Sequence, residues 1–276
     1  KLMIKKIWHI IQLTLQMLIV VAVGFGISLG ISISVMESQR FPSDGEIKSL
    51  DNISSHLDQK EKRAVLTSRR SIVQVFSASN TGVAKMSGTY VTYNGKFYVL
   101  TAAHGIAGSC MHTRIVADKE EGYDCIQFIL IDSRVDYAIV QVPEIPERTP
   151  VVLPAAMPTA REWRQELAVL TETFYTGYPN GLGPLTFRGA IAGTSPDKYI
   201  YLHSYAWPGS SGSGVFTYDG HMIGILIALN VGFTGAGYDV LEDLVIVTPL
   251  FMIDWDTAYE IMQAPDPSGD TGDTGE

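Results

Sequence analysis

The stretch YVLTAAHGIAG, residues 98–108, is an apolar run that ends at a histidine followed at once by a glycine. Such a run is typical of a buried strand. A single histidine at a strand end is most often a half-buried structural side chain. A chemical role for His104 therefore depends on the residues that the rest of the chain brings to it.

Short β-type runs separated by turn signals continue on both sides of this stretch. Asn94-Gly95 and Asp219-Gly220 each stand between two alternating runs, which is the strongest short signal for a β-hairpin. A proline-rich segment, residues 142–158, divides the runs into two groups. Because no helical pattern separates the runs within a group, the sequence predicts an all-β fold made of two similar units.

The two units are expected to be six-stranded-type antiparallel β-barrels, at about residues 71–145 and 165–250. Apolar residues in the segment 249–262 have the spacing of one closing helix. The folded domain is therefore predicted to span residues 71–263. The remaining residues, 264–276, are acidic and are not expected to pack against it.

The N-terminal part of the chain has the composition of a transmembrane helix. Residues 7–36 contain no Asp, Glu, Lys or Arg and are numerous enough to cross a hydrocarbon core. Lys1, Lys5 and Lys6 precede this run, so the positive-inside rule places the N-terminus in the cytoplasm. We therefore expect a single-pass anchor over residues 1–36, with the domain on the exported side (periplasmic, extracellular or lumenal). A cleaved signal peptide is the alternative, although its apolar region is normally shorter.

Small residues recur every fourth position in this run, at Ala22, Gly26, Gly30 and Ser34. They share one helix face, which would let a second copy approach closely and self-associate. Glycine and serine are also common in membrane helices for other reasons, so both interpretations stay open.

The segment between the anchor and the domain is polar and charged. Ile47, Leu50, Ile53 and Leu57 recur at helix-like spacing in it. Residues 37–70 are therefore expected to form a polar stalk that contains a short amphipathic helix.

Charge and cysteine content exclude several classes of function. The net charge is −9, with no basic cluster beyond the N-terminal lysines, so no nucleic-acid partner is expected. Cys110 and Cys125 are too few for a structural zinc site, and we expect no metal or other cofactor. Export would place these two cysteines in an oxidising compartment, where they could form a disulfide. Two buried thiols in a reducing compartment are the alternative.

Three segments with chemistry-bearing residues occur in a fixed order along the chain. His104 lies in TAAHG, Asp136 begins DYAIV, and Ser211 lies in GSSGSG. This order and these contexts resemble the chymotrypsin-like (trypsin-like) serine proteases, in the style of the bacterial and viral members. The resemblance covers roughly residues 71–262 and implies a serine endopeptidase that acts on proteins or peptides.

The resemblance implies a role for each residue. A serine hydroxyl is a poor nucleophile until a neutral imidazole takes its proton, and a carboxylate must hold that imidazole in the correct tautomer. His104 would be the base, Asp136 the carboxylate and Ser211 the nucleophile. The backbone amides of Gly209 and Ser211 would form the oxyanion hole.

Substrate specificity is less well defined by the sequence. By resemblance, His203 and Tyr205 would lie near the floor of the pocket for the substrate side chain before the cleaved bond, and Leu226 would form its wall. These residues favour an uncharged, apolar or small side chain there. Ser210 stands where the digestive enzymes have an aspartate, so activation by an ion pair with a new N-terminus is not expected.

The sequence leaves two other functions open. A catalytically silent, protease-like binding module would use the same fold without chemistry, and the intact His104, Asp136 and Ser211 argue against it. A structural anchor protein that merely displays the C-terminal segment would leave these three residues unexplained.

Overall fold

The computed structural model describes residues 2–40, 53–117, 122–158, 161–163, 167–234 and 237–264. The chain divides into two compact units, residues 1–54 and 55–276. The predicted acidic segment from residue 265 onward lies outside the described residues.

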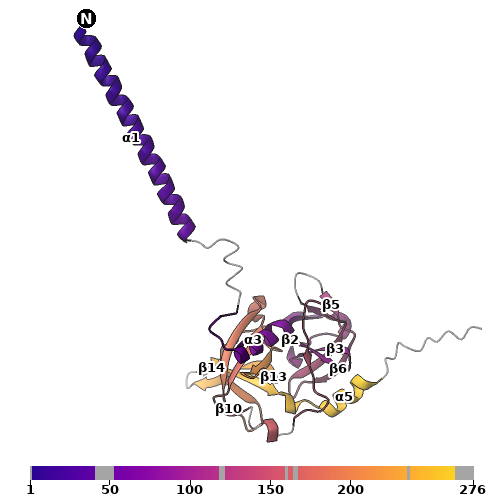
Figure 1. Ribbon diagram of the computed structural model, residues 1–276. Helices are drawn as coiled ribbons and strands as arrows, with labels where there is room; N and C mark the ends of the chain where they lie inside the picture. Colours follow the sequence, from indigo (N-terminus) through magenta and orange to yellow (C-terminus); the bar gives the residue numbers. More distant parts are fainter. Residues whose placement is uncertain are drawn as a thin grey trace, which may run out of the picture. The chain divides into compact units, whose positions relative to one another are not determined.

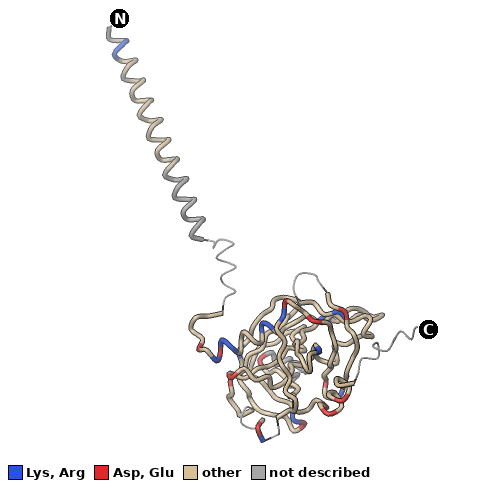
Figure 2. The backbone as a smooth tube through the Cα atoms, turned by 45° about the vertical axis from the view of Figure 1, so that its right-hand side comes forward, with Lys and Arg blue, Asp and Glu red and all other residues tan. Residues whose placement is uncertain are grey.

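The first unit contains the helix α1 (Leu2–Arg40). Its stretch Lys5–Phe25 is long and apolar enough to cross a membrane, by length and composition, and none of it is buried. In the described part of this stretch, Figure 2 shows charged residues only near the N-terminal end. The small-residue pattern also depends on positions 26, 30 and 34. The side chains at these positions lie outside what the structure describes.

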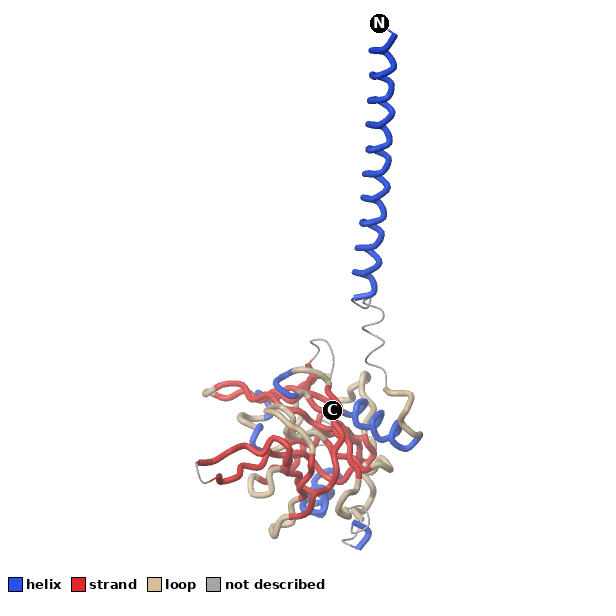
Figure 3. The backbone as a smooth tube through the Cα atoms, turned by 90° about the vertical axis from the view of Figure 1, so that its left-hand side faces the viewer, coloured by secondary structure: helices blue, strands red, loops and turns tan. Residues whose placement is uncertain are grey.

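The second unit is mostly β-structure, as predicted, and Figure 3 shows strands making up most of it. The first sheet has the order β5-β4-β1-β2-β3-β7-β6, with β8 pairing β2 in parallel. Its strands are β1 (Ile72–Ser79), β2 (Gly82–Tyr93), β3 (Lys96–Thr101), β4 (Thr113–Val116), β5 (Gly122–Asp124), β6 (Gln127–Asp132), β7 (Tyr137–Val142) and β8 (Val151–Val152).

The second sheet is a closed barrel of order β10-β11-β14-β13-β12-β9. Its strands are β9 (Glu172–Gly177), β10 (Leu185–Thr194), β11 (Ile200–His203), β12 (Gly214–Thr217), β13 (Met222–Thr234) and β14 (Gly237–Pro249). The closing helix α5 (Trp255–Gln263) follows it after a short 3-10 turn, Leu250–Met252. This part of the prediction is confirmed.

The first sheet supplies the first of the two predicted barrel units, as an eight-stranded half-barrel. Its two edge strands, β5 and β6, are consecutive in the chain and are joined through Cys125 and Ile126 alone. Hydrogen bonds from Cys125 N to Thr113 O and from Ile126 N to Gln141 O hold this short connection against both edges. The sheet therefore curves back on itself, but among the described residues no ladder of hydrogen bonds closes it.

Both predicted hairpins are present. Asn94 and Gly95 connect β2 to β3 with φ values of 49° and 75°, the left-handed pair that a tight hairpin turn requires. Gly220 connects β12 to β13 with a φ of 87°. The Asn-Gly turn fixes the register of β3, and β3 carries the chain directly to His104.

The predicted stalk differs from the structure after residue 55. The helix α3 (Gln59–Ser71) packs against β9, β12 and β2 of the second unit and buries Ala64 and Val65. Asp58 caps its N-terminus through hydrogen bonds to the backbone amides of Lys60 and Glu61. The predicted repeat from Ile47 partly lies outside the described residues, and the helix that packs is the next segment along the chain.

Arg148 fastens the two halves of the second unit together. Its guanidinium donates to the carbonyl oxygens of Ile72 (2.7 Å) and Ala117 and to the hydroxyl of Tyr178 (3.1 Å). Ile72 and Ala117 belong to the first half, and Tyr178 follows β9 of the barrel. These hydrogen bonds hold the connection between the two sheets in place.

Candidate functional site

His104 lies just beyond the end of β3, in a single 3-10 turn, Ala103–Gly105. Its side chain is half exposed, and its Nδ1 lies 2.7 Å from Asp136 Oδ2. The backbone amide of His104 also donates to Asp136 Oδ1, over 2.8 Å. Two hydrogen bonds to one carboxylate fix both the backbone and the ring of His104. Asp136 is therefore the partner of the histidine in the stretch 98–108.

Asp136 occupies the turn between β6 and β7. The carboxylate of Asp132 accepts from the backbone amides of Arg134 (2.7 Å) and Val135 (3.2 Å), which closes the turn. Thr248 Oγ1 donates to the Val135 carbonyl at 2.7 Å, so the barrel also holds this turn. Asp136 itself has a φ of 64°, a conformation that aspartate tolerates better than most residues.

The pair has a clear electrostatic consequence. The hydrogen bond that the His104 ring donates to Asp136 raises the pKa of His104 above its ordinary value of 6.5, and burial opposes this rise only in part. The carboxylate therefore stabilises a positive charge on the ring, as a base that accepts a proton during a reaction requires.

Ser211 lies in the tight loop between Trp207 and β12. Gly212 follows it with a φ of 89°, and a Cβ there would clash with the carbonyl oxygen of Ser87. The Ser211 hydroxyl donates to the Ile227 carbonyl over 3.2 Å. Among the described residues no hydrogen bond joins this hydroxyl to the His104 ring.

Two backbone amides of this loop point in directions that the neighbouring carbonyls determine. The Pro208 carbonyl accepts from Asn180 N (2.7 Å), and the Ser210 carbonyl accepts from Ser213 N (3.1 Å). In a trans peptide the N–H points opposite to the C=O, so the amides of Gly209 and Ser211 point away from those donors. Within the described part of the chain, neither of these two amides donates to an acceptor.

One cleft of about 460 Å³ collects these groups. His104, Asp136 and Ser211 line it together with apolar side chains. The apolar lining consists of Ala206, Trp207, Pro208, Leu226 and Ile227.

The structure separates the residues that we predicted for the specificity pocket. Leu226 lines the cleft beside Ser211, whereas His203 and Tyr205 line a different cavity of about 260 Å³. Strand alternation explains His203, because its neighbour Leu202 points into the core and leaves the His203 side chain exposed. Tyr205 stacks on Trp207 and is 58% exposed.

Ser87 is a residue of this site that the sequence analysis missed. It lies in β2, in the first sheet, yet its amide donates to the Ser211 carbonyl (2.9 Å) and its hydroxyl donates to the Gly209 carbonyl (2.8 Å). The same hydroxyl accepts from Tyr178 N at 2.9 Å. Ser87 stands in a strand that also contains Lys85, Thr89 and Thr92, so nothing in the local sequence marked it.

Cys110 and Cys125 form a disulfide in the structure, with their Cα atoms 5.3 Å apart. It ties the segment after His104 to the connection between β5 and β6. Among the described residues, no group of three or more His, Cys, Asp or Glu side chains could hold a metal ion.

Comparisons with known proteins agree with this architecture. A family model described as a trypsin-like peptidase domain matches residues 86–225, half of the chain. No curated protein matches the chain. The matched residues include His104, Asp136 and Ser211 together with parts of both sheets.

Several solved structures are similar in fold. A serine endoprotease from Yersinia pestis has a TM-score of 0.55 and 17% identity, over 75% of this chain and 69% of that one. A protease from M. tuberculosis in its active form has a TM-score of 0.56 and 19% identity, over 79% and 92%. The HtrA-type protease AlgW, solved with a tripeptide, has a TM-score of 0.54 and 19% identity, over 74% and 62%. With the match of the family model, the chain belongs to the trypsin-like peptidase domain family and is a serine endopeptidase.

Proposed function

We propose that the protein hydrolyses peptide bonds with Ser211 as nucleophile, His104 as general base and Asp136 as the carboxylate that orients His104. The observation that carries this proposal is the hydrogen bond of 2.7 Å between His104 Nδ1 and Asp136 Oδ2, in the cleft that Ser211 also lines. Each side chain has the chemistry that its role needs.

The reaction follows from these positions. With a proton on Nδ1 donated to Asp136, the Nε2 atom of His104 is free to accept the proton of Ser211. The Ser211 hydroxyl must first leave the Ile227 carbonyl, and such catalytic contacts often form only when substrate binds. Its oxygen then attacks the peptide carbonyl, and His104 passes the proton to the departing amine. Water then attacks in the same way, with His104 as base, and releases the acyl group from Ser211.

The amides of Gly209 and Ser211 are proposed to stabilise the negative oxygen of the tetrahedral intermediate. The directions imposed by the Pro208 and Ser210 carbonyls support this role, as does the lack of acceptors for both amides among the described residues. Gly209 suits this loop because its φ is 95° and a Cβ would lie 2.6 Å from the Tyr178 carbonyl oxygen. Each such donor is typically worth about 3 kcal/mol of transition-state stabilisation.

The lining of the cleft supports an uncharged, apolar side chain in the substrate before the cleaved bond. Beside Ser211 the walls come from Leu226, Ala206 and Trp207, and His104 and Asp136 are the only ionisable side chains among the described lining residues. His203 and Tyr205 are not part of this proposal because they line the other cavity.

Helix α1 is proposed to anchor the enzyme in a membrane, with the protease unit on the exported side. Its described large apolar side chains between Ile7 and Ile27 are exposed, as lipid contact requires. A signal sequence has the same composition, so removal of this helix in the mature protein is the competing outcome.

Peptidase assays on single variants test the proposal. Ser211→Ala and His104→Ala should each remove nearly all turnover, and the double variant should lose little more because the residues act as a unit. Ser213→Ala is the matched control, since Ser213 is a buried serine two positions away and should keep most activity. Full turnover in a folded Ser211→Ala variant would contradict the proposal. An inert but folded wild type would instead indicate the silent binding module.

A further inference from the structure

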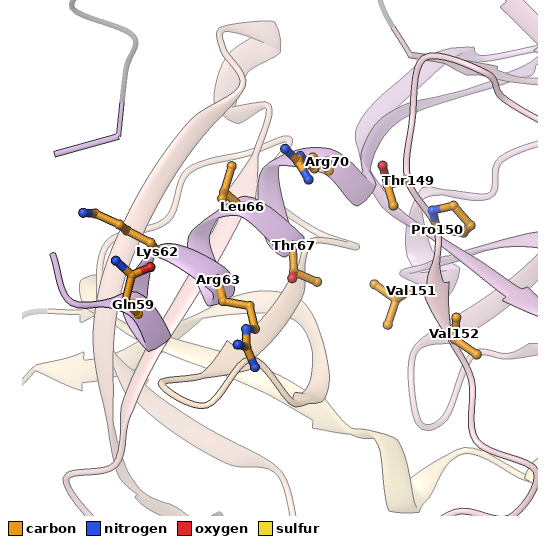
Figure 4. A pocket seen from close by; sticks show the side chains of 10 residues that line it. All are labelled: Gln59, Lys62, Arg63, Leu66, Thr67, Arg70, Thr149, Pro150, Val151 and Val152. Atoms are coloured by element: carbon orange, nitrogen blue, oxygen red, sulfur yellow. The ribbon is translucent and has the colours of Figure 1, made fainter. Parts of the chain in front are cut away.

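A groove of about 450 Å³ lies between α3 and the segment that leads into β8 (Figure 4). It shares no lining residue with the cleft around Ser211. Lys62, Arg63 and Arg70 line it from the helix, with the hydroxyl groups of Thr67 and Thr149, and none of its described lining residues is acidic. The groove is therefore a basic surface with hydrogen-bonding side chains.

Among the described residues, the three cations of this groove have no anionic partner. The one acceptor that Lys62 Nζ has in the described part of the chain is the Ser55 carbonyl, at 3.4 Å. In the described part of the chain, the side chains of Arg63 and Arg70 form no hydrogen bond or ion pair. The one acidic residue of α3, Glu61, is paired with Arg188, on the barrel. The groove thus carries uncompensated positive charge.

The last described residues of the chain lie close to the strand that supports this groove. Lys96 Nζ donates to the Ala264 carbonyl (3.3 Å), and Gln263 Nε2 donates to the Tyr93 hydroxyl (3.0 Å). Tyr93 follows Thr92 in β2, and Thr92 is the partner of Val152 in the lining of the groove. Two adjacent positions of β2 therefore connect the end of α5 to the groove.

The segment that follows Ala264 has the complementary charge. Residues 265–276 contain four acidic residues and no Lys or Arg, the acids being Asp266, Asp270, Asp273 and Glu276. Extended, this segment reaches up to about 40 Å. We propose that residues 265–276 bind back into the groove, with their carboxylates against Lys62, Arg63 and Arg70. The bound segment would clamp α3 to the connection between the two sheets.

Photo-crosslinking of the full chain in detergent tests this proposal independently of peptide hydrolysis. A benzophenone amino acid replaces Thr271, and the crosslinked peptides are mapped by mass spectrometry. The expected products join this position to residues 59–70 or 149–152. Their yield should fall about tenfold in Arg63→Gln/Arg70→Gln and in 1 M salt, because several exposed ion pairs are lost or screened together. Arg134→Gln is the matched control, since Arg134 is 91% exposed and lies outside the groove.

Exchanging the charges of the groove and the segment distinguishes loss of the interaction from misfolding of the variants. Arg63→Glu/Arg70→Glu should remove the crosslink, and adding Asp270→Lys/Asp273→Lys should restore it. Crosslinks that map elsewhere, or that are insensitive to salt and to both arginines, would overturn the proposal. Crosslinks between isotopically distinct copies would also overturn it, since the occupant would then be the segment of a second molecule.

Discussion

At the scale of single residues, the proposed chemistry depends on what Asp136 does to His104. The hydrogen bond that the imidazole donates to the carboxylate raises the pKa of the imidazole above 6.5, although burial works against it. A general base must be neutral, so activity should appear as the pH rises through this pKa. The acid limb of kcat/KM in the wild type is therefore expected to have its midpoint above pH 6.5.

Asp136→Asn should shift that limb and lower the rate together. Without the negative partner, burial is left as the main influence on the ring, so the midpoint should move to lower pH. The amide also favours the wrong tautomer, so kcat should fall by about 10⁴ while the fold stays intact. A pH profile of kcat/KM with a melting curve measures both effects. An unchanged midpoint in a folded Asp136→Asn protein would show that the carboxylate does not act on His104.

Ser87 is predicted to act as a positioning residue for the loop of Ser211. Ser87→Ala removes the hydroxyl bonds to the Gly209 carbonyl and the Tyr178 amide, which should loosen the loop and lower kcat by about tenfold to a hundredfold with little change in KM. Ser68→Ala is the matched control, because it also removes a buried hydrogen bond (to Thr176, 2.8 Å) but lies on α3. Equal losses of stability with equal kcat in both variants would refute a positioning role.

At the scale of elements, helices and strands with strong local sequence signals were predicted correctly, and those with weak signals were not. The Asn-Gly turn and the long alternating runs fix the hairpin of β2 and β3. Strands β4, β5 and β8 are four residues or fewer, too short for a periodic pattern to indicate them. The helix α3 was missed as part of the domain because it buries mostly small residues, including Ala64 and Ser68, instead of large apolar ones.

The residues of the site also divide into those that the local sequence marks and those that it does not. His104, Asp136 and Ser211 lie in recognisable local segments, so the sequence alone singled them out. Ser87 acts from the other sheet through its backbone and hydroxyl, a tertiary relation that no local pattern encodes. The position of Tyr205 likewise depends on how its ring stacks on Trp207.

The disulfide is predicted to stabilise the connection behind the histidine loop. Cys110 and Cys125 are 15 residues apart, and closing a loop of that length is worth about 3 kcal/mol in the chain-entropy model. Cys110→Ser/Cys125→Ser should lower the free energy of unfolding by about this amount, measured by denaturant titration. Equal alkylation of both thiols before and after reduction of the wild type would exclude the bridge.

At the scale of the whole molecule, α1 is expected to hold the full chain in membranes. The stretch Lys5–Phe25 has a mean hydropathy of 1.9, and a membrane would cover its exposed apolar side chains. The full chain should remain in the membrane pellet through an alkaline carbonate wash. A version that starts at Ser55, where the second compact unit begins, is the control and should stay in the supernatant. Release of the full chain into the wash would refute the anchor.

The central claim is that one serine in the whole molecule is activated by a histidine and a carboxylate. A fluorophosphonate probe reacts with such a serine, and mass spectrometry of the digested protein locates the adduct. We predict a single adduct on Ser211, formed in the wild type and in Ser213→Ala and lost in His104→Ala. Modification of a different serine, or a folded wild type that stays unlabelled, would contradict the account.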